Sequence, residues 1–547
     1  MSKEYTGYSP ENIIFLGAGA TAALMPPTSG IAKFITNLTK KDKSLNERIE
    51  NSCDNFSQKH KDGLKSLLLM LGDEGNVQKE TEIKKRAEKF AIAYQGNKAE
   101  IIKNLHKLSE LYNWECFKTI AHHSETDSDE VISIMTLYTQ FDILINSGAG
   151  FKTKKKFFYP YEVVAARNCI VLISNLLLYA NTNYNLENHK DIKEKYESFF
   201  NILAELMRIE GIEKENIDYE SREFILFSYA IISFNWDPVL LGMLFNSHKE
   251  INHSNKAPYL GKRCQKLRLF NDFGIVIGSL RMDNDDKEPK LWYQGHESIA
   301  KRLNDNEYPN RLMRVGKYLF PHGSSAFRIC PVCKKTNFVV RNLGTDYLNY
   351  YGPGILPEFG DFYSDELLTQ NEIEEFKNGK FDAVQCYECG NIMQLIDTPL
   401  IFQTAVKGTK PPLLEEAVNE MLVLIKKAKH LIFNGYSLPP DDVLYRSMIK
   451  NTIADNYNRS DEINDKLKIS VILYDNSAKD KTWYSQEETK ELVKNGKIDQ
   501  YVAKNVNGFI NLFQNCEIRF CFKGFPDVLG NNITEESVKE FLNFENI

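Results

Sequence analysis

The stretch Asn12-Ile13-Ile14-Phe15-Leu16-Gly17-Ala18-Gly19-Ala20-Thr21 decides the fold of this chain. Its apolar half has the β-branched and aromatic residues of a buried parallel strand, and two glycines follow at once. Glycines at this point let the backbone approach an anionic ligand, and a following helix adds the positive end of its dipole. The residues from Gly17 to Thr21 are therefore predicted to form a phosphate-binding loop. An ordinary tight turn is the alternative, because the third glycine of the dinucleotide fingerprint is absent.

The composition is that of a soluble globular protein with several domains. The chain has 547 residues, of which 42% are apolar and 26% are charged, so large cores can form. A net charge of −6 gives no general attraction to nucleic acid, because phosphate binding requires clustered excess Lys and Arg. We therefore expect no direct nucleic-acid partner.

Neither a signal peptide nor a membrane span is expected. No apolar run follows the charged N-terminal residues, as a signal peptide would require. The most apolar helical stretch, Val163 to Tyr179, contains Arg167 and Asn168 and is too short to cross a bilayer of about 30 Å. The sequence predicts a cytoplasmic protein in which this stretch is a buried helix.

Two C-x-x-C pairs stand out among the ten cysteines: Cys330-Pro-Val-Cys333 and Cys386-Tyr-Glu-Cys389. Each pair presents two thiolates on one tight turn, and together they supply the tetrahedral set that zinc prefers. Four thiolates leave no open coordination position, so the zinc is predicted to be structural. A redox pair is the alternative. The long segment between the pairs predicts an inserted excursion.

Helical periodicity dominates from the first loop to about residue 220. Apolar residues at Ile31, Phe34, Ile35 and Leu38 have helical spacing, and the Lys-, Glu- and Asn-rich sequence after residue 40 repeats this pattern with few strand signals. We interpret residues 40–220 as a helical insertion that packs on the core or binds a partner.

Three further strands are predicted to end, like the first, in small or polar residues. Residues 225–234 run into Asn235-Trp236-Asp237-Pro238, residues 428–434 into Gly435-Tyr436-Ser437, and residues 469–474 into Asp475-Asn476. Such a set is typical of a doubly wound, mostly parallel, Rossmann-like α/β sheet, which binds ligands at the carboxyl ends of its strands. Residues 399–402 are also predicted to be a strand, and residues 413–429 an amphipathic helix.

The order of these motifs resembles that of the sirtuin family. It runs from Gly17-Ala18-Gly19-Ala20-Thr21 through Ser233-Phe234-Asn235-Trp236-Asp237 and His322-Gly323 to the two C-x-x-C pairs, Gly435-Tyr436-Ser437-Leu438 and Asp475-Asn476. The resemblance implies an NAD-binding core with an inserted zinc ribbon, and leaves the long insertions unexplained. The implied boundaries are a core at 1–39, 221–250 and 399–547, a helical insertion at 40–220, an irregular insertion at 251–315, and a histidine segment with the zinc ribbon at 316–398.

By motif match, the resemblance also implies roles for single residues. The first loop, Gly17, Ala18, Gly19, Ala20 and Thr21, would hold the NAD pyrophosphate. Gly435 and Ser437 match the family's second glycine-serine turn, and Asn476 matches an asparagine that contacts the adenosine ribose. Asn235 and Asp237 would lie near the nicotinamide and its ribose, and His322 matches the catalytic histidine.

One departure points to a particular branch of the family. Sirtuin deacylases carry an aspartate and an arginine after the first loop, whereas Ser29-Gly30-Ile31-Ala32-Lys33-Phe34-Ile35 has neither. Together with Asn235-Trp236-Asp237 and the helical insertion, this looks more like the bacterial sirtuin-like NAD hydrolases of antiphage defence. Those enzymes often lack the zinc ribbon, so the four cysteines keep the deacylase alternative open.

The residues themselves fit cleavage of the bond between nicotinamide and ribose, which passes through a cationic sugar. Asn235 can hold a water, Asp237 can stabilise the cation, and His322 can accept a proton from water or from a ribose hydroxyl. Asp237 can equally be a helix cap ahead of Val239, with Pro238 at the first helical position. Ser437 and Asn476 can equally be turn or capping residues.

The leading expectation is hydrolysis of NAD to nicotinamide and ADP-ribose by a regulated effector of bacterial immunity. NAD-dependent deacylation of protein lysines is the first alternative, and a non-catalytic sensor of NAD or ADP-ribose is the second. Asn235 and His322 count against the sensor. An uncontrolled NAD hydrolase would poison its own host, so we expect control by homo-oligomer assembly or by a second, regulatory protein.

Overall fold

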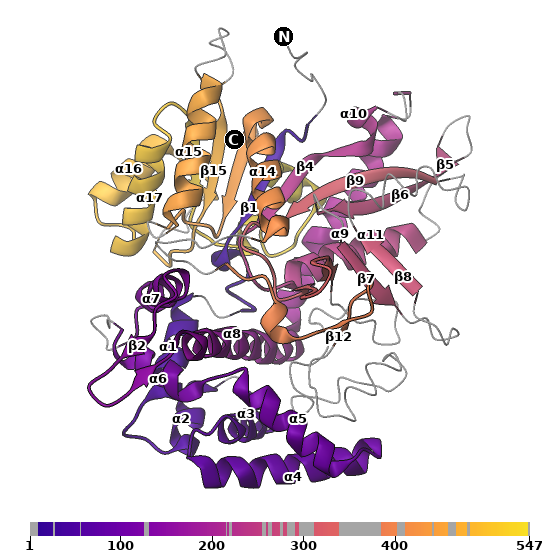
Figure 1. Cartoon of the computed structure of the whole chain (residues 1–547). Helices are drawn as coiled ribbons and strands as arrows, with labels where there is room; N and C mark the ends of the chain where they lie inside the picture. The colour runs from indigo at the N-terminus through magenta and orange to yellow at the C-terminus, as the bar shows by residue number, and fades with distance from the viewer. Residues whose placement is uncertain are drawn as a thin grey trace.

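The computed structural model of the chain describes most of its residues (Figure 1). The described ranges are 9–25, 28–54, 56–124, 131–214, 216–217, 221–253, 259–260, 265–273, 277–281, 290–294, 311–338, 384–401, 411–439, 442–457, 466–477 and 482–544. Most of the predicted excursion between the two cysteine pairs lies outside these ranges.

One large sheet organises these residues, in the order β16-β17-β15-β14-β1-β4-β9-β6-β5. Every neighbouring pair from β17 to β6 is parallel, and the two edge strands run antiparallel to their neighbours. The prediction of an α/β protein with a mostly parallel sheet is confirmed. The strands are β1 (Asn12–Leu16), β4 (Leu226–Ser233), β5 (Tyr259–Leu260), β6 (Gln265–Asp272), β9 (Arg311–Leu319), β14 (His430–Asn434), β15 (Lys468–Ile472), β16 (Tyr484–Ser485) and β17 (Glu517–Cys521).

Strand β1 lies in the middle of the strands with polar ends. Leu16 is in register with Ser233 of β4 on one side and with Asn434 of β14 on the other. Asn434 is in turn in register with Ile472 of β15. The four strands therefore finish together, at the edge where open α/β sheets bind ligands. We call this the carboxyl edge.

Strands β5 and β6 and the first part of β9 come from the segment that the sequence suggested was an irregular insertion, residues 251–315. β6 and β9 pair in parallel from Lys266 with Arg311 to Asp272 with Lys317. Charged residues interrupt the apolar pattern by which buried strands are recognised in the sequence. Lys317 of β9, for example, is buried and forms an ion pair with Asp272 of β6, with 3.5 Å between Nζ and Oδ2. These strands of the segment are therefore part of the core sheet, whereas β7 and β8 belong to a smaller sheet.

The expected strand at residues 399–402 is wrong for its described part, residues 399–401, which has no strand pairing. Pro399 has no amide hydrogen to offer a neighbouring strand. The Ile401 amide donates instead to the carbonyl of His322 at 3.0 Å. The segment is an irregular support for the turn that carries His322.

Helices cover both faces of the sheet. Ile13 and Phe15 belong to the core cluster formed with α14, α15 and α17, whereas Ile14 and Leu16 belong to the cluster formed with α9 and α11. Figure 1 shows the N-terminal helices below the sheet, at its carboxyl edge. The described helices are α1 (Thr28–Thr39), α2 (Leu45–Ser52), α3 (Gln58–Met70), α4 (Asn76–Tyr94), α5 (Lys98–Glu110), α6 (Trp114–His122), α7 (Ile134–Asn146), α8 (Pro160–Asn188), α9 (Lys190–Glu213), α10 (Arg222–Ile225), α11 (Val239–His253), α14 (Pro412–Lys427), α15 (Val443–Tyr457), α16 (Gln486–Lys494), α17 (Gln500–Leu512) and α18 (Glu535–Leu542).

Helix α8 contains the apolar stretch that the sequence singled out. It is the one described helix whose length and composition would allow it to cross a membrane. In this structure 82% of its most apolar window is buried inside the protein, as in the core helix of a globular domain. The expectation that this stretch is a buried helix is confirmed.

Small sheets complete the described fold. One lies between α7 and α8, and the others contain the short strands around the cysteine pairs together with β7 and β8. These strands are β2 (Phe151–Lys152) with β3 (Phe157–Phe158), β10 (Phe327–Ile329) with β11 (Thr336–Phe338), β7 (Ile277–Arg281) and β8 (Lys290–Gln294), and β12 (Val384–Gln385) with β13 (Ile392–Met393).

Candidate functional site

Four of the five amides in the predicted phosphate loop already donate to backbone carbonyls. The bonds are Gly17 N to Asn434 O (3.0 Å), Gly19 N to Gly435 O (3.0 Å), Ala20 N to Gly17 O (2.8 Å) and Thr21 N to Ala18 O (3.3 Å). A single 3-10 turn over Ala18–Ala20 follows β1, and α1 begins only at Thr28. A ligand that used most of these amides would have to displace bonds that the protein makes with itself.

The glycines of this loop are required by contacts with the second glycine turn. A Cβ on Gly17 would lie 2.5 Å from Gly435 O, and one on Gly19 would lie 2.8 Å from Gly435 Cα. Gly435 has a φ of +63°, and a Cβ there would lie 2.1 Å from Ala20 N. The two turns therefore pack backbone on backbone, which explains these three glycines whether or not a ligand binds.

Thr21 joins Asn235 to Asp237. Asn235 Nδ2 donates to Thr21 Oγ1 at 3.2 Å, and Thr21 Oγ1 donates to Asp237 Oδ2 at 3.2 Å. The Val239 amide donates to Asp237 Oδ1 at 3.3 Å, so Asp237 also caps the start of α11. The alternative interpretation of Asp237 as a cap is correct, and it does not exclude a role in the site, because the second carboxylate oxygen faces Thr21.

Asp237 is a buried acid. Loss of hydration raises the pKa of its carboxyl to about 6, and the hydrogen bonds from Val239 and Thr21 only partly oppose this rise. At neutral pH the group still carries most of its charge. A carboxylate with little competing water interacts more strongly with a nearby cation than an exposed one does.

His322 faces a second carboxylate. Its ring meets Phe234 and Tyr445 edge-on, with 4.8 Å between centroids in each case. Its Nε2 lies 3.3 Å from Asp442 Oδ2, and the Tyr436 hydroxyl donates to the same oxygen at 2.6 Å. A fixed carboxylate at this distance orients the ring and stabilises a positive charge that forms on it.

The sequence did not reveal Asp442 or Tyr436. Asp442 stands just before α15, and its carbonyl accepts the Arg446 amide, so in the sequence it has the properties of an ordinary residue at a helix start. Only the fold brings its side chain to His322. In the second turn the serine was the predicted functional residue, whereas the neighbouring tyrosine supplies the hydroxyl that holds Asp442.

The candidate catalytic residues are covered in this structure. The exposed fractions are 1% for His322, 6% for Asn235 and 7% for Asp237. The helical insertion supplies part of the cover: the Tyr138 ring of α7 lies 6.3 Å from the Trp236 ring, and the Tyr196 hydroxyl of α9 donates to Ala20 O at 2.8 Å. The insertion is therefore part of the wall of the site.

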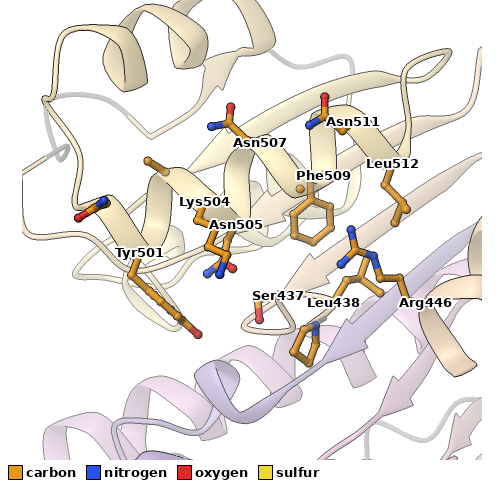
Figure 2. Close-up of a pocket in the computed structure, with 14 residues that line it drawn as sticks. Ser437, Leu438, Arg446, Tyr501, Lys504, Asn505, Asn507, Phe509, Asn511 and Leu512 are labelled. Carbon is orange, nitrogen blue, oxygen red and sulfur yellow. The ribbon is translucent and has the colours of Figure 1, made fainter. Parts of the chain in front are cut away.

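The remaining predicted cofactor residues lie at the same edge but outside this network. Ser437 lines an open pocket beside the second turn (Figure 2). Asn476 is exposed and accepts a hydrogen bond from the Tyr474 hydroxyl at 2.7 Å. Asn434, which was not predicted, is fully buried at the end of β14, and its side-chain amide has no hydrogen-bond partner among the described residues. It is an available donor and acceptor beside the two glycine turns.

The four predicted zinc ligands converge. The sulfur atoms of Cys330, Cys333, Cys386 and Cys389 all lie within 4.8 Å of one another. The Cys330 and Cys389 sulfurs are 3.5 Å apart, and those of Cys333 and Cys386 are 3.6 Å apart. Zinc–sulfur bonds of about 2.3 Å in a tetrahedron place sulfur atoms about 3.8 Å apart. The cluster is therefore compatible with a structural zinc site.

Side-chain amides support the cysteine sulfurs. Asn337, buried in the cluster, donates to Cys386 Sγ at 3.5 Å and accepts the Tyr387 amide at 2.9 Å. Asn391 donates to Cys389 Sγ at 3.2 Å, and this bond lowers the pKa of the Cys389 thiol to about 6. Donors of this kind stabilise thiolates, which are the form that binds metal.

Neither a protein-family model nor a curated protein matches this chain.

Proposed function

We propose that this chain hydrolyses NAD to nicotinamide and ADP-ribose, as a regulated NAD-depleting effector of bacterial antiphage defence. One observation carries the proposal: Asn235, Asp237 and His322 gather at the carboxyl edge of a mostly parallel sheet. The order of their motifs along the chain resembles that of the sirtuins.

The three side chains have complementary roles in this proposal. Cleavage of the nicotinamide bond leaves a positive charge on the ribose, which the dehydrated carboxylate of Asp237 would stabilise. Asn235, held by Thr21, would orient the attacking water. His322, backed by Asp442, would take the proton that this water releases.

The cofactor would lie across the ends of β1, β4, β14 and β15. The Ala18 amide is the loop donor that makes no backbone hydrogen bond among the described residues, so we expect it to meet the pyrophosphate first. The side-chain amide of Asn434 is a second available polar group nearby. Gly435, Ser437 and Asn476 keep the adenosine-side roles that the resemblance implies.

The covered state of the site supports regulation. A dinucleotide cannot reach His322 or Asn235 while these side chains are almost fully buried. Because α7 and α9 contribute to the cover, a movement of the helical insertion would open the site. Self-assembly or a second protein that binds this insertion would supply such a trigger in the cytoplasm.

The four-cysteine cluster favours a second candidate, NAD-dependent deacylation of protein lysines. A zinc ribbon beside the histidine segment is typical of the deacylases that the chain resembles. The missing aspartate and arginine after the first loop argue for water as the acceptor instead.

The test is the fate of NAD incubated with the protein at several concentrations, with and without an acyl-lysine peptide. We expect nicotinamide release without peptide, and a loss of about a hundredfold or more in His322→Ala and in Asn235→Ala. His123→Ala, on an exposed residue of the helical insertion, is the matched control and keeps full activity. Release that occurs only with peptide, in step with deacylation, decides for the second candidate. Absence of release together with absence of any NAD-dependent change in melting temperature rejects both.

A further inference from the structure

A pocket of about 800 Å³ opens beside the second glycine turn (Figure 2). One wall is the turn itself, from Ser437 to Pro439, with Arg446 of α15. The opposite wall is a face of α17. This volume is in the range of small-molecule sites. The proposed cleavage of NAD uses only Ser437 among the residues that line the pocket.

The pocket is positively charged. Among the described residues that line it, the charged ones are Arg446 and Lys504, and none is an acid. Within the described part of the chain, neither cation forms an ion pair with a carboxylate. Two cations that converge on one pocket without a neutralising acid favour an anionic ligand.

The pocket side of α17 is poorly suited to a helix. The 13-residue helix contains several residues with low helix propensity, namely Asn505, Asn507, Gly508 and Asn511. A Cβ on Gly508 would meet no atom within 4 Å, so packing does not require glycine there. Val502 and Val506 anchor the opposite side of the helix in the core, and the buried Phe509 belongs to that core and also lines the pocket. The pocket side instead offers amide groups and space.

The lining residues are arranged along the length of the pocket. Figure 2 shows Lys504 and Asn505 pointing from α17 toward the Ser437 turn, with Tyr501 at one end and Arg446 at the other. Tyr501 is 69% exposed, which is unusual for a large aromatic side chain. A flat ring can stack on it while an anionic group lies toward Lys504 and Arg446.

The turn in the pocket wall is strained. Leu438 has a φ of +50°, in the left-handed region that side chains with a Cβ seldom occupy. Strain of this kind persists where surrounding structure enforces it, and it is concentrated at ligand sites and switches. The strained residue Leu438 directly follows Ser437, so a ligand in the pocket would contact a turn whose conformation can change.

We propose that this pocket binds a nucleotide as a regulatory ligand, separate from the NAD that is cleaved. The base ring stacks on Tyr501, Asn505 contacts its edge, and the phosphates lie between Lys504 and Arg446. A single-stranded nucleic acid offers the same groups, but the two walls form a pocket of about 800 Å³, a size that suits one nucleotide rather than a strand.

The path from the pocket to the first loop is short. Gly435, two residues before Ser437, accepts the Gly19 amide at 3.0 Å. The other wall is tied to the same edge, because the Asp499 amide at the start of α17 donates to Asp475 Oδ2 at 2.6 Å. Binding in the pocket therefore biases the turn that packs on the first loop. Regulation in this sense rests on the proposed function, whereas nucleotide binding does not.

The test is a calorimetric titration of the full chain with ADP, with adenosine and inorganic pyrophosphate as partial ligands. We expect saturable binding of ADP and weaker binding of both fragments. Gly508→Leu places a branched side chain against the bound nucleotide and weakens binding about tenfold or more, whereas the matched Gly508→Ala leaves it within about twofold. Lys504→Ala and Arg446→Ala each weaken binding about tenfold. Lys490→Ala, an exposed lysine on the neighbouring α16, has no effect.

Several results would overturn the inference. The inference is wrong if wild-type protein does not bind ADP. It is also wrong if Ala18→Leu abolishes ADP binding while Gly508→Leu and Lys504→Ala leave that binding unchanged, because ADP then binds at the first loop. If a single-stranded oligonucleotide binds more tightly than ADP at the same residues, the pocket is part of a nucleic-acid-binding surface and the proposed nucleotide ligand is wrong. Nicotinamide release is measured in parallel, because ADP binding that persists in a chain without turnover rejects the NAD hydrolase and keeps the pocket.

Discussion

The four-cysteine cluster and the first glycine turn are built in opposite ways. In the cluster, four sulfur atoms crowd within 4.8 Å of one another, and a metal would supply the strong bonds that thiols do not make among themselves. In the glycine turn, four of the five amides already bond to protein carbonyls, and the glycines are explained by contact with Gly435. The cluster is therefore compatible with a metal that would hold it together, whereas the turn is held mainly by hydrogen bonds within the protein.

Removing one sulfur gives the largest expected effect. Cys386→Ser should reduce bound zinc from about one equivalent to almost none and destabilise the cysteine segments, because a structural zinc contributes about 10 kcal/mol in small domains. Metal analysis of chelator-free protein and thermal unfolding measure the two effects.

Cys516→Ser is the control for this prediction. Cys516 is buried but is not one of the four clustered cysteines, so this variant keeps its zinc. Wild-type protein that carries less than about half an equivalent of zinc would contradict the interpretation of the cluster.

The glycine turn offers the second prediction. Gly435→Ala forces a Cβ to within 2.1 Å of Ala20 N at a positive φ, so we expect a loss of about 3 kcal/mol in the free energy of unfolding. Ala18→Leu adds its side chain at an exposed position, so it should preserve stability and block NAD. Denaturant unfolding and NAD titration of both variants separate packing from binding. Gly435→Ala with unchanged stability would show that the turns do not need their close contact.

The same contrast explains what the sequence could predict. In the cysteine pairs the chemistry is in the side chains and their spacing, so the four ligands were identified and the structure brings them together. In the loop the chemistry depends on which amides are used by tertiary contacts. No pattern within Gly17-Ala18-Gly19-Ala20-Thr21 shows that Asn434 O and Gly435 O accept two of them.

The sheet was predictable for a related reason. Four apolar runs that end in polar residues predicted a mostly parallel sheet, and the structure places these four strands side by side in such a sheet. β6 and β9 were not predicted, because ion pairs such as that between Lys317 and Asp272 interrupt the apolar pattern of a buried strand. The role of Asp442 beside the candidate catalytic histidine was not predicted, because His322 lies far from it in the sequence.

Asp237 provides a third prediction, with opposite effects on stability and activity. Its folded pKa of about 6 lies above the ordinary value, so its favourable contribution to stability is complete below about pH 4 and is lost as pH rises through 6. Asp237→Asn should match wild type near pH 4 and be more stable by up to about 3 kcal/mol at pH 8. Nicotinamide release should fall about a hundredfold.

Urea unfolding across this pH range measures the effect of Asp237→Asn on stability. The exposed Asp527→Asn is the control and should show no gain at high pH. An Asp237→Asn variant that retains full activity would leave Asp237 as a helix cap alone.

The smallest expected effect concerns a buried group away from the carboxyl edge. His248 on α11 packs against Gly316, and neither of its ring nitrogens has a hydrogen-bond partner among the described residues. Burial lowers its pKa to about 3, so the neutral ring costs no stability above about pH 6.5. Below that pH the unfolded chain binds a proton that the folded protein does not, and the free energy of unfolding falls. His322 differs, because Asp442 faces its ring.

His248→Leu should therefore leave stability at pH 7 and nicotinamide release almost unchanged, and should reduce the loss of stability between pH 7 and pH 5 by about 2 kcal/mol. Urea unfolding at the two pH values measures this difference, with the exposed His123→Leu as a control that should not show it. Asn434 and His248 are both buried, and their side chains have no hydrogen-bond partner within the described part of the chain, but only Asn434 lies beside the glycine turns. If His248→Leu abolished nicotinamide release in a folded protein, the residues needed for activity would extend from the carboxyl edge to α11. The groups around the glycine turns would then not be the whole active site.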